Sequence, residues 1–219
     1  MGFEFFDPAG ELRIRVGNLP HWFQPGVTYF VTFRTDDSLP AEAARLWYAR
    51  RDDWLERQGI DPRAANRSAL IGKLPTPQQR EFHKRFSRQW MEYLDRGCGA
   101  CVLKRPDLAR IVADNLKYFD GERYRLGDFV VMPNHVHVLV NLLGQTDLEK
   151  QCYSWKKYTA TKINRALAQR GRFWHEESFD HLVRSAEELE QLRLYIAENP
   201  QKARLHEGQY LLWRCGELP

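Results

Sequence analysis

The alternation of apolar and polar positions predicts a small number of strands. Residues rich in β-branched and aromatic side chains form three runs, at 27–34, 124–132 and 135–143, and each is typical of a strand. Only Pro133 and Asn134 separate the second run from the third, which predicts a hairpin in the middle of the chain. A shorter run at 180–184 predicts a fourth strand.

Apolar residues recur at helical spacing in the segments between these runs. The predicted helices cover about 40–58, 76–97, 106–119, 147–168 and 187–199. Pro77 stands in the first turn of the second helix, where proline is tolerated, and Pro200 is expected to stop the last helix.

The order strand, helices, strand, strand, helix, strand, helix predicts an α+β fold, specifically a ferredoxin-like sandwich with an enlarged first helical connection. The length of 219 residues suits one domain, 1–219, with a helical insertion at about 40–119.

Composition and charge predict where the protein is located and weakly indicate what it binds. The net charge is +4, which mildly favours a polyanionic partner. No apolar stretch is long enough to span a bilayer, and the acidic N-terminus does not resemble a signal peptide, so we expect a cytoplasmic protein. Cys98 and Cys101 form a CxxC, but Cys152 and Cys215 lie far apart, so free thiols are expected rather than a zinc site.

Two histidines at the start of the third strand are the first candidates for chemistry. Side chains two positions apart on a strand project from the same face, so the imidazoles of His135 and His137 converge. Such a pair is typical of a metal site, although two structural histidines would give the same pattern. The Asp-His that follows this motif in metallo-β-lactamase-type hydrolases does not occur here.

The chain resembles the REP-associated branch of the single-tyrosine HUH transposases. The motifs that carry the resemblance are Leu19-Pro-His21, Gly26–Arg34, Met132-Pro-Asn-His-Val-His137, Ser154-Trp-Lys-Lys157, Gly171-Arg-Phe-Trp174, Phe179–Arg184 and Tyr195–Pro200. They cover roughly residues 11–34 and 123–215. The helical block at 40–119 is longer than in compact members of the family.

The resemblance implies a central antiparallel sheet that contains the histidine strand. It implies nicking and rejoining of single-stranded DNA through a 5′-phosphotyrosine, with Mg²⁺ or Mn²⁺ as cofactor. The implied substrate is a DNA hairpin, a REP-like palindrome with a flanking tetranucleotide. A monomer is expected, cytoplasmic and bound to the nucleoid when it is on DNA.

Two of the nine tyrosines are candidates for the nucleophile, Tyr158 in a basic helix and Tyr195 in the last helix. At about 100° per residue, Tyr195 and Asn199 share one flank of the apolar stripe of the last helix. In the family the nucleophile stands four residues before the Asn of an Asn-Pro. Tyr195 is therefore the predicted nucleophile, and a structural tyrosine at the core margin is the alternative.

Two further side chains are candidates near this site. Asn199 is the candidate third metal ligand, since an amide oxygen with two imidazoles suits Mg²⁺ or Mn²⁺, and the alternative is a helix cap before Pro200. His181 is a candidate helper in proton transfer, and a structural histidine is an equal alternative.

The segment between Glu149 and Arg172 predicts a DNA-binding surface, because it holds seven basic residues and one acid. Nearby aromatic residues could stack on bases, although a charged helix face is often only solvated. The candidate DNA-binding residues are Lys150, Lys156, Lys157, Lys162, Arg165, Arg172 and Trp155, with Arg13, Arg15 and Arg34 as weaker candidates. Phe173 and Trp174 are further stacking candidates.

Three other functions remain open from the sequence. A relaxase or rolling-circle initiator would share the histidine pair and tyrosine, usually in a larger chain. A catalytically silent DNA-binding regulator would keep the basic helix. A metal hydrolase unrelated to DNA would need acids around the metal, which the region of the histidine pair lacks.

Overall fold

The computed structural model describes residues 2–11, 13–16, 20–64, 67–82, 85–86 and 97–216. The strands are β1 Arg13–Val16, β2 Pro20–Phe23, β3 Thr28–Arg34, β4 Tyr124–Val131, β5 His135–Leu142, β6 Phe179–Leu182 and β7 Leu211–Trp213. The helices are α1 Ala41–Arg57, α2 Arg67–Lys73, α3 Thr76–Phe82, the short 3₁₀ helix η2 Val102–Lys104, α5 Pro106–Lys117, α6 Leu148–Ala166 and α7 Ala186–Lys202.

The main sheet has five antiparallel strands in the order β6-β3-β5-β4-β7. Strands β6, β3, β5 and β4 lie side by side in the order of a ferredoxin-like sheet, with β3 and β5 in the centre. The predicted α+β class with a central antiparallel sheet is confirmed. In this strand order, β5 is hydrogen-bonded to β3 on one side and to β4 on the other.

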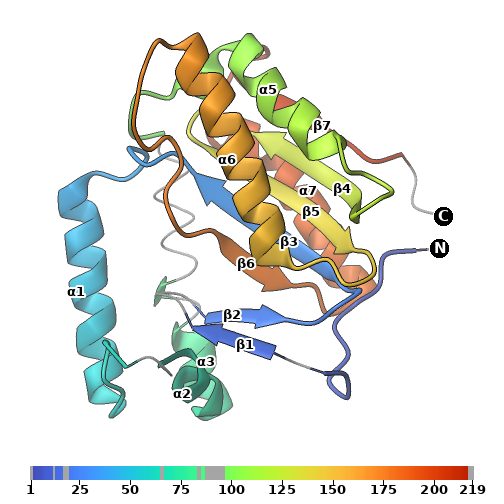
Figure 1. The fold of residues 1–219 in the computed structure, drawn as a ribbon. Helices are drawn as coiled ribbons and strands as arrows, with labels where there is room; N and C mark the ends of the chain where they lie inside the picture. Colours follow the sequence, from blue (N-terminus) through green and yellow to red (C-terminus); the bar gives the residue numbers. More distant parts are fainter. Residues whose placement is uncertain are drawn as a thin grey trace.

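The two faces of this sheet are covered by different helices (Figure 1). Helices α5 and α6 pack on one face, where the largest core cluster includes Val31, Val136 and Val138. Helix α7 covers the other face, where its residues Leu189 and Ile196 share a hydrophobic cluster with Phe30 and Leu139 of the sheet. Because strand side chains alternate between faces, His135 and His137 belong to the α7 face.

The boundaries of most predicted elements lie within two residues of the observed boundaries, but the C-terminal end of the last helix does not. It continues through Pro200 to Lys202, so the prediction that proline stops it is wrong. Proline removes one helical donor, yet later residues still donate: Ala203 N–H to Asn199 O and Leu205 N–H to Pro200 O, at 3.0 and 2.9 Å. The helix therefore gains a turn beyond Asn199.

The helical insertion has a hydrophobic cluster of its own, built from residues between Leu39 and Phe86 around Trp47 and Trp54. The sequence predicts helix α1 closely, whereas it does not predict α2. Of the helix predicted at 76–97, α3 covers 76–82, and residues 83–84 and 87–96 lie outside the described ranges.

Three short strands are not predicted by the sequence pattern. The pair β1-β2 forms a small sheet of its own, and β7 adds an edge to the main sheet beside β4. Across the described ranges, no helix is both long and apolar enough to cross a membrane.

Trp155 is the largest side chain that joins α6 to the sheet. It is 1 % exposed, and its indole Nε1–H donates to Tyr124 Oη at 3.0 Å. The Tyr124 hydroxyl donates in turn to Leu116 O at 2.7 Å. One indole therefore ties α6 to β4 and, through Tyr124, to α5.

We expect Trp155→Ala to lower the free energy of unfolding by about 3–5 kcal/mol, the usual cost of truncating a buried aromatic side chain. Urea denaturation followed by circular dichroism measures this change. Tyr153→Ala is the matched control on the outer side of the same helix, where Tyr153 is 62 % exposed, and should change stability by only about 0.5 kcal/mol. Equal destabilisation of both variants would contradict the assignment of Trp155 to the core.

Candidate active site

The centre of the candidate site is the histidine pair at the start of β5. His135 and His137 are 1 % and 0 % exposed, and their Nε2 atoms lie 3.0 Å apart. In the sheet, His137 is opposite Thr32 and His135 is opposite Arg34. The central position of β5 therefore fixes both imidazoles on the face that α7 covers.

The outer nitrogen of each imidazole has a hydrogen-bond partner. Thr32 Oγ1 lies 2.7 Å from His137 Nδ1, and Asn134 Oδ1 lies 2.7 Å from His135 Nδ1. These contacts orient both rings so that the two Nε2 atoms face each other. Neither Thr32 nor Asn134 was predicted. Thr32 lies opposite His137 only because of the register between β3 and β5, and the direction of the Asn134 side chain depends on the turn before β5.

Burial keeps the two imidazoles neutral. It lowers the pKa of His135 to about 3 and lowers the pKa of His137 well below its ordinary value, with a further contribution from His135. A neutral imidazole offers a nitrogen lone pair, which is the form that binds metal ions.

The spacing of the two nitrogen atoms suits an octahedral cation. Two ligands held at right angles, about 2.1 Å from such an ion, lie about 3.0 Å apart, which is the observed Nε2–Nε2 distance. Within the described ranges, no group of three His, Cys, Asp or Glu side chains could hold a metal ion. Among the described residues, a third protein ligand would therefore have to be of another type, such as an amide.

Helix α7 brings Tyr195 against the histidine pair. Ser185 caps the start of the helix, since its hydroxyl accepts the Glu188 N–H at 3.2 Å, and Leu189 and Ile196 pack into the core. The Tyr195 ring contacts the His137 ring with 5.2 Å between centroids and 68° between planes. Sequence positions 58 residues apart thus meet in one site.

Two more aromatic contacts hold this arrangement. Phe30 stacks on His137 at 5.3 Å between ring centroids and meets Tyr195 edge-on at 5.9 Å. The phenolic oxygen of Tyr195 is buried from solvent. Phe30 was not among the predicted site residues, because an apolar strand residue has no signal that separates it from ordinary core.

Asn199 and Lys202 lie further along the same helix. Asn199 is 0 % exposed and its Oδ1 is buried, so it is an interior residue one turn beyond Tyr195. Lys202 Nζ lies 5.6 Å from the Tyr195 ring centroid. Sequence reasoning missed Lys202, because it ended the helix at Asn199.

Tyr158, the other candidate nucleophile, lies on α6 and hence over the opposite face of the sheet (Figure 1). Its side chain is 50 % exposed, with Lys162 Nζ 5.5 Å from the ring centroid. The structure therefore brings Tyr195, and not Tyr158, to the histidine pair.

His181 has a structural partner. Its Nε2 lies 2.9 Å from Glu188 Oε1, while Glu188 Oε2 accepts the Arg184 N–H at 2.7 Å. The hydrogen bond with His181 lowers the pKa of Glu188. These contacts join β6 to the first turn of α7, which favours the structural alternative over a role in proton transfer.

Several predicted DNA-binding residues are exposed on α6 and on the segment after it, namely Lys157, Lys162, Arg165 and Arg172. Arg172 also forms loose ion pairs with Asp36 and Glu176, at 4.0 and 3.7 Å. Strand β1 contains Arg13 and Arg15, but their side chains lie outside the described residues.

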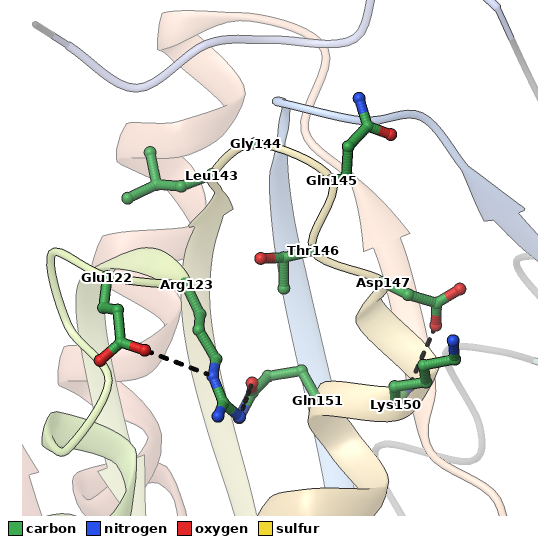
Figure 2. Close-up of a pocket in the computed structure, with 9 residues that line it drawn as sticks. All are labelled: Glu122, Arg123, Leu143, Gly144, Gln145, Thr146, Asp147, Lys150 and Gln151. Atoms are coloured by element: carbon green, nitrogen blue, oxygen red, sulfur yellow. Dashed lines mark hydrogen bonds and ion pairs between the residues drawn. The ribbon is translucent and has the colours of Figure 1, made fainter.

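Lys150 lies apart from these residues, at the other end of β5. It lines a cavity of about 460 Å³ together with residues of the turn after β5 (Figure 2). Asp147 Oδ1 accepts the Lys150 N–H at 3.0 Å, and the Glu122 carboxylate lines the same cavity. Acids and bases are thus mixed here, unlike the outer face of α6.

Two predicted DNA contacts, Trp155 and Arg34, are corrected by their burial, whereas Lys156 is half-buried. Trp155 is a core residue and has no face open to a base. Arg34 is 4 % exposed, and its Nη1 donates to Ser38 Oγ at 3.0 Å. Lys156 Nζ donates to Glu176 O at 2.6 Å, and burial lowers the pKa of this lysine. Trp155 and Arg34 were assigned by residue type, whereas their burial decides their role.

The two other proposed stacking residues are buried as well. Phe173 and Trp174 are 8 % and 4 % exposed, and Trp174 Nε1–H donates to Thr159 Oγ1 at 2.8 Å. Their segment extends the edge of the sheet: His175 N–H donates to Arg34 O at 2.8 Å and Asp36 N–H to Phe173 O at 2.9 Å. The basic residues just before it therefore lie at the same end of the sheet as His135, which is opposite Arg34.

Comparison with known proteins gives two similarities. No curated protein matches the chain. A solved structure described as a REP-associated tyrosine transposase bound to a REP hairpin shares 16 % identity, with a TM-score of 0.44 over 83 % of this chain and 71 % of that one. Residues 104–199, which include the histidine pair and end on Asn199, match the family model described as IS200-like transposase.

Proposed function

We propose that this protein is a metal-dependent DNA strand transferase that uses Tyr195 as its nucleophile. The observation that carries the proposal is the contact of the Tyr195 ring with His137. His137 is one of two buried, neutral imidazoles whose Nε2 atoms lie 3.0 Å apart. The match of residues 104–199 to IS200-like transposases supports a DNA transposase-type activity. Together they favour covalent chemistry on DNA.

In the proposed reaction, the Tyr195 oxygen attacks a backbone phosphorus of single-stranded DNA. A bond forms between this oxygen and phosphorus, and the bond from phosphorus to the 3′ oxygen breaks. The net proton transfer is from the phenol to the departing oxygen, which gives a 5′-phosphotyrosine and a free 3′-hydroxyl. Attack by a 3′-hydroxyl on the phosphotyrosine reverses these changes and joins strands.

His135, His137 and Asn199 are the proposed ligands of Mg²⁺ or Mn²⁺. The two imidazoles have the spacing that an octahedral ion requires, and Asn199 contributes a buried amide oxygen on the helix that bears Tyr195. When bound, the cation would neutralise charge on the nonbridging phosphate oxygens. The protein fixes the ligands beforehand through Thr32 and Asn134.

The proposed DNA path runs around one end of the sheet. Arg172 and the end of α6 lie at the end where β3 finishes and His135 begins β5. Exposed Lys162 and Arg165 belong to the last turns of α6. A DNA strand whose phosphates are bound there would pass from the α6 face of the sheet to the face with the histidine pair. We propose that the substrate is a single-stranded hairpin.

We further propose that the protein acts as a monomer. Both histidines, Tyr195 and Asn199 come from one chain and lie on the same side of one sheet. A second copy is not needed to complete the site.

The test of this function is a pair of end-labelled hairpin oligonucleotides, incubated with the protein and Mn²⁺ and separated on a denaturing gel. A 3′-end label should appear in a slow-moving protein adduct, because the tyrosine keeps the 5′ phosphate of the downstream fragment. A 5′-end label should appear in a shorter free oligonucleotide. Binding without either product would favour the catalytically silent regulator instead.

The DNA path makes a separate prediction about salt. We expect Lys162→Ala combined with Arg165→Ala to weaken hairpin binding and to reduce the slope of log K against log salt by about 0.7 for each phosphate that is no longer neutralised. Fluorescence anisotropy at several salt concentrations measures the slope. Arg63→Ala with Lys73→Ala, two residues of the insertion, is the charge-matched control. The same slope in both double variants would exclude this end of α6 from the DNA surface.

A further inference from the structure

We infer that Asn134 is a positioning residue that fixes the tautomer of His135 and connects this imidazole to the loop at 97–101. Asn134 lies in the tight turn between β4 and β5, where Met132 N–H donates to His135 O at 2.8 Å. Its side chain is 1 % exposed. The inference rests on the proposed metal site for its functional meaning.

The hydrogen bonds of the Asn134 amide determine which nitrogen of His135 carries the hydrogen. Asn134 Nδ2 lies 2.9 Å from Cys98 O. A backbone carbonyl only accepts, so the amide group facing it must be the NH₂. The other end of the amide is then the oxygen, which also only accepts, and it lies 2.7 Å from His135 Nδ1. His135 Nδ1 must therefore carry the hydrogen, which leaves Nε2 with its lone pair toward the proposed metal position.

Thr32 does not impose the same restriction on His137. A hydroxyl group both donates and accepts, so Thr32 Oγ1 is compatible with either tautomer of His137 at its distance of 2.7 Å. Asn134 is thus the contact that sets the hydrogen-bonding direction at the histidine pair. His135 therefore already has the tautomer that a metal ligand needs, whereas His137 can take either tautomer.

The surroundings of Asn134 hold its amide in place. Its backbone carbonyl accepts from Thr35 N–H at 2.8 Å and from the Thr35 hydroxyl at 3.2 Å. The loop that supplies Cys98 O is anchored as well, since Ala100 N–H donates to Asp37 Oδ2 at 2.7 Å and Leu103 N–H donates to Pro133 O at 3.1 Å. Both partners of the amide are therefore fixed to the same end of the sheet.

The experiment compares Asn134→Ala with Asn141→Ala. Asn141 is a matched control near the far end of β5, the strand that begins at His135. It is 2 % exposed, and its Nδ2 donates to Gly26 O at 2.9 Å. Both variants remove a buried amide that binds a backbone carbonyl. Only Asn134→Ala removes an acceptor for a histidine.

Two readouts are measured on each protein. Nitrogen-15 NMR of the imidazoles should show His135 with Nδ1 protonated in the wild type and in Asn141→Ala, and a mixture of tautomers in Asn134→Ala. Titration with Mn²⁺, followed by electron paramagnetic resonance, should show affinity about 10–100-fold weaker in Asn134→Ala, the usual effect of removing a hydrogen bond that supports a metal ligand. Asn141→Ala should bind Mn²⁺ like the wild type.

Asn134→Asp tests the same inference with a smaller change. The carboxylate still accepts from His135 Nδ1, so the tautomer should be kept and Mn²⁺ affinity should stay close to that of the wild type, although the hydrogen bond to Cys98 O disappears. A single, unchanged His135 tautomer in Asn134→Ala would overturn the inference. Absence of Mn²⁺ binding in the wild type would instead remove the proposed metal site, and the NMR comparison would still decide the role of Asn134.

Discussion

Tyr195→Phe is expected to abolish the covalent protein–DNA adduct while leaving hairpin and metal binding intact. The substitution removes one buried oxygen and keeps the ring that contacts His137 and Phe30. Packing should therefore change little, whereas nucleophilic catalysis has no replacement for the missing hydroxyl. The measurement is the 3′-labelled adduct on a denaturing gel, together with anisotropy for binding.

Tyr158→Phe is the matched control, since it makes the same chemical change on the opposite face of the sheet. It should retain the adduct, because the Tyr158 side chain is 50 % exposed on α6. An adduct in Tyr195→Phe combined with its absence in Tyr158→Phe would refute the assignment of the nucleophile to α7.

His137→Ala is expected to have a comparably large effect, through the metal. This imidazole is one of only two nitrogen ligands that we propose, and it also contacts the Tyr195 ring. DNA cleavage at a fixed Mn²⁺ concentration should fall by more than the 10–100-fold typical of changes one layer out from a metal. Initial rates of product formation across a Mn²⁺ titration measure the decrease.

Val138→Ala separates this effect from an ordinary packing defect. Val138 is the next residue on β5, is 0 % exposed and belongs to the core on the α5 and α6 face. The substitution should lower stability by roughly 1.5–3 kcal/mol, because it removes two buried methyl groups and leaves a small cavity, and should leave the cleavage rate of the folded protein near that of the wild type. Cleavage by His137→Ala at the wild-type rate would refute the metal assignment.

Local periodicity explains why much of the site was predictable. The two-residue repeat of a strand is enough to put His135 and His137 on one face, and the helical repeat is enough to group Tyr195 with Asn199. The same rule places Trp155 on the apolar side of its helix. Its assignment to DNA stacking relied on residue type alone, and the structure agrees with the periodicity.

Contacts between distant segments were not predictable in the same way. Thr32 faces His137 only because β3 pairs with β5 in one register, and that register depends on the whole sheet. Arg34 looked like a surface base at a strand end, yet it is 4 % exposed. Its guanidinium donates to Ser38 in the loop after β3, and its backbone carbonyl accepts from His175 N–H. The position of Lys202 depended on whether a proline inside a helix is tolerated, which the packing around α7 decides.

The separate hydrophobic cluster of the insertion has a consequence for the order of folding. The Thr32–His137 contact closes a loop of 105 residues, and such long-range pairing slows folding. Among the described residues, the insertion cluster lies between Leu39 and Phe86, so these contacts are nearer in sequence and need no part of β5. We expect it to form early and to shorten the chain that β3 and β5 must close, so that the histidine pair is completed later than the insertion cluster.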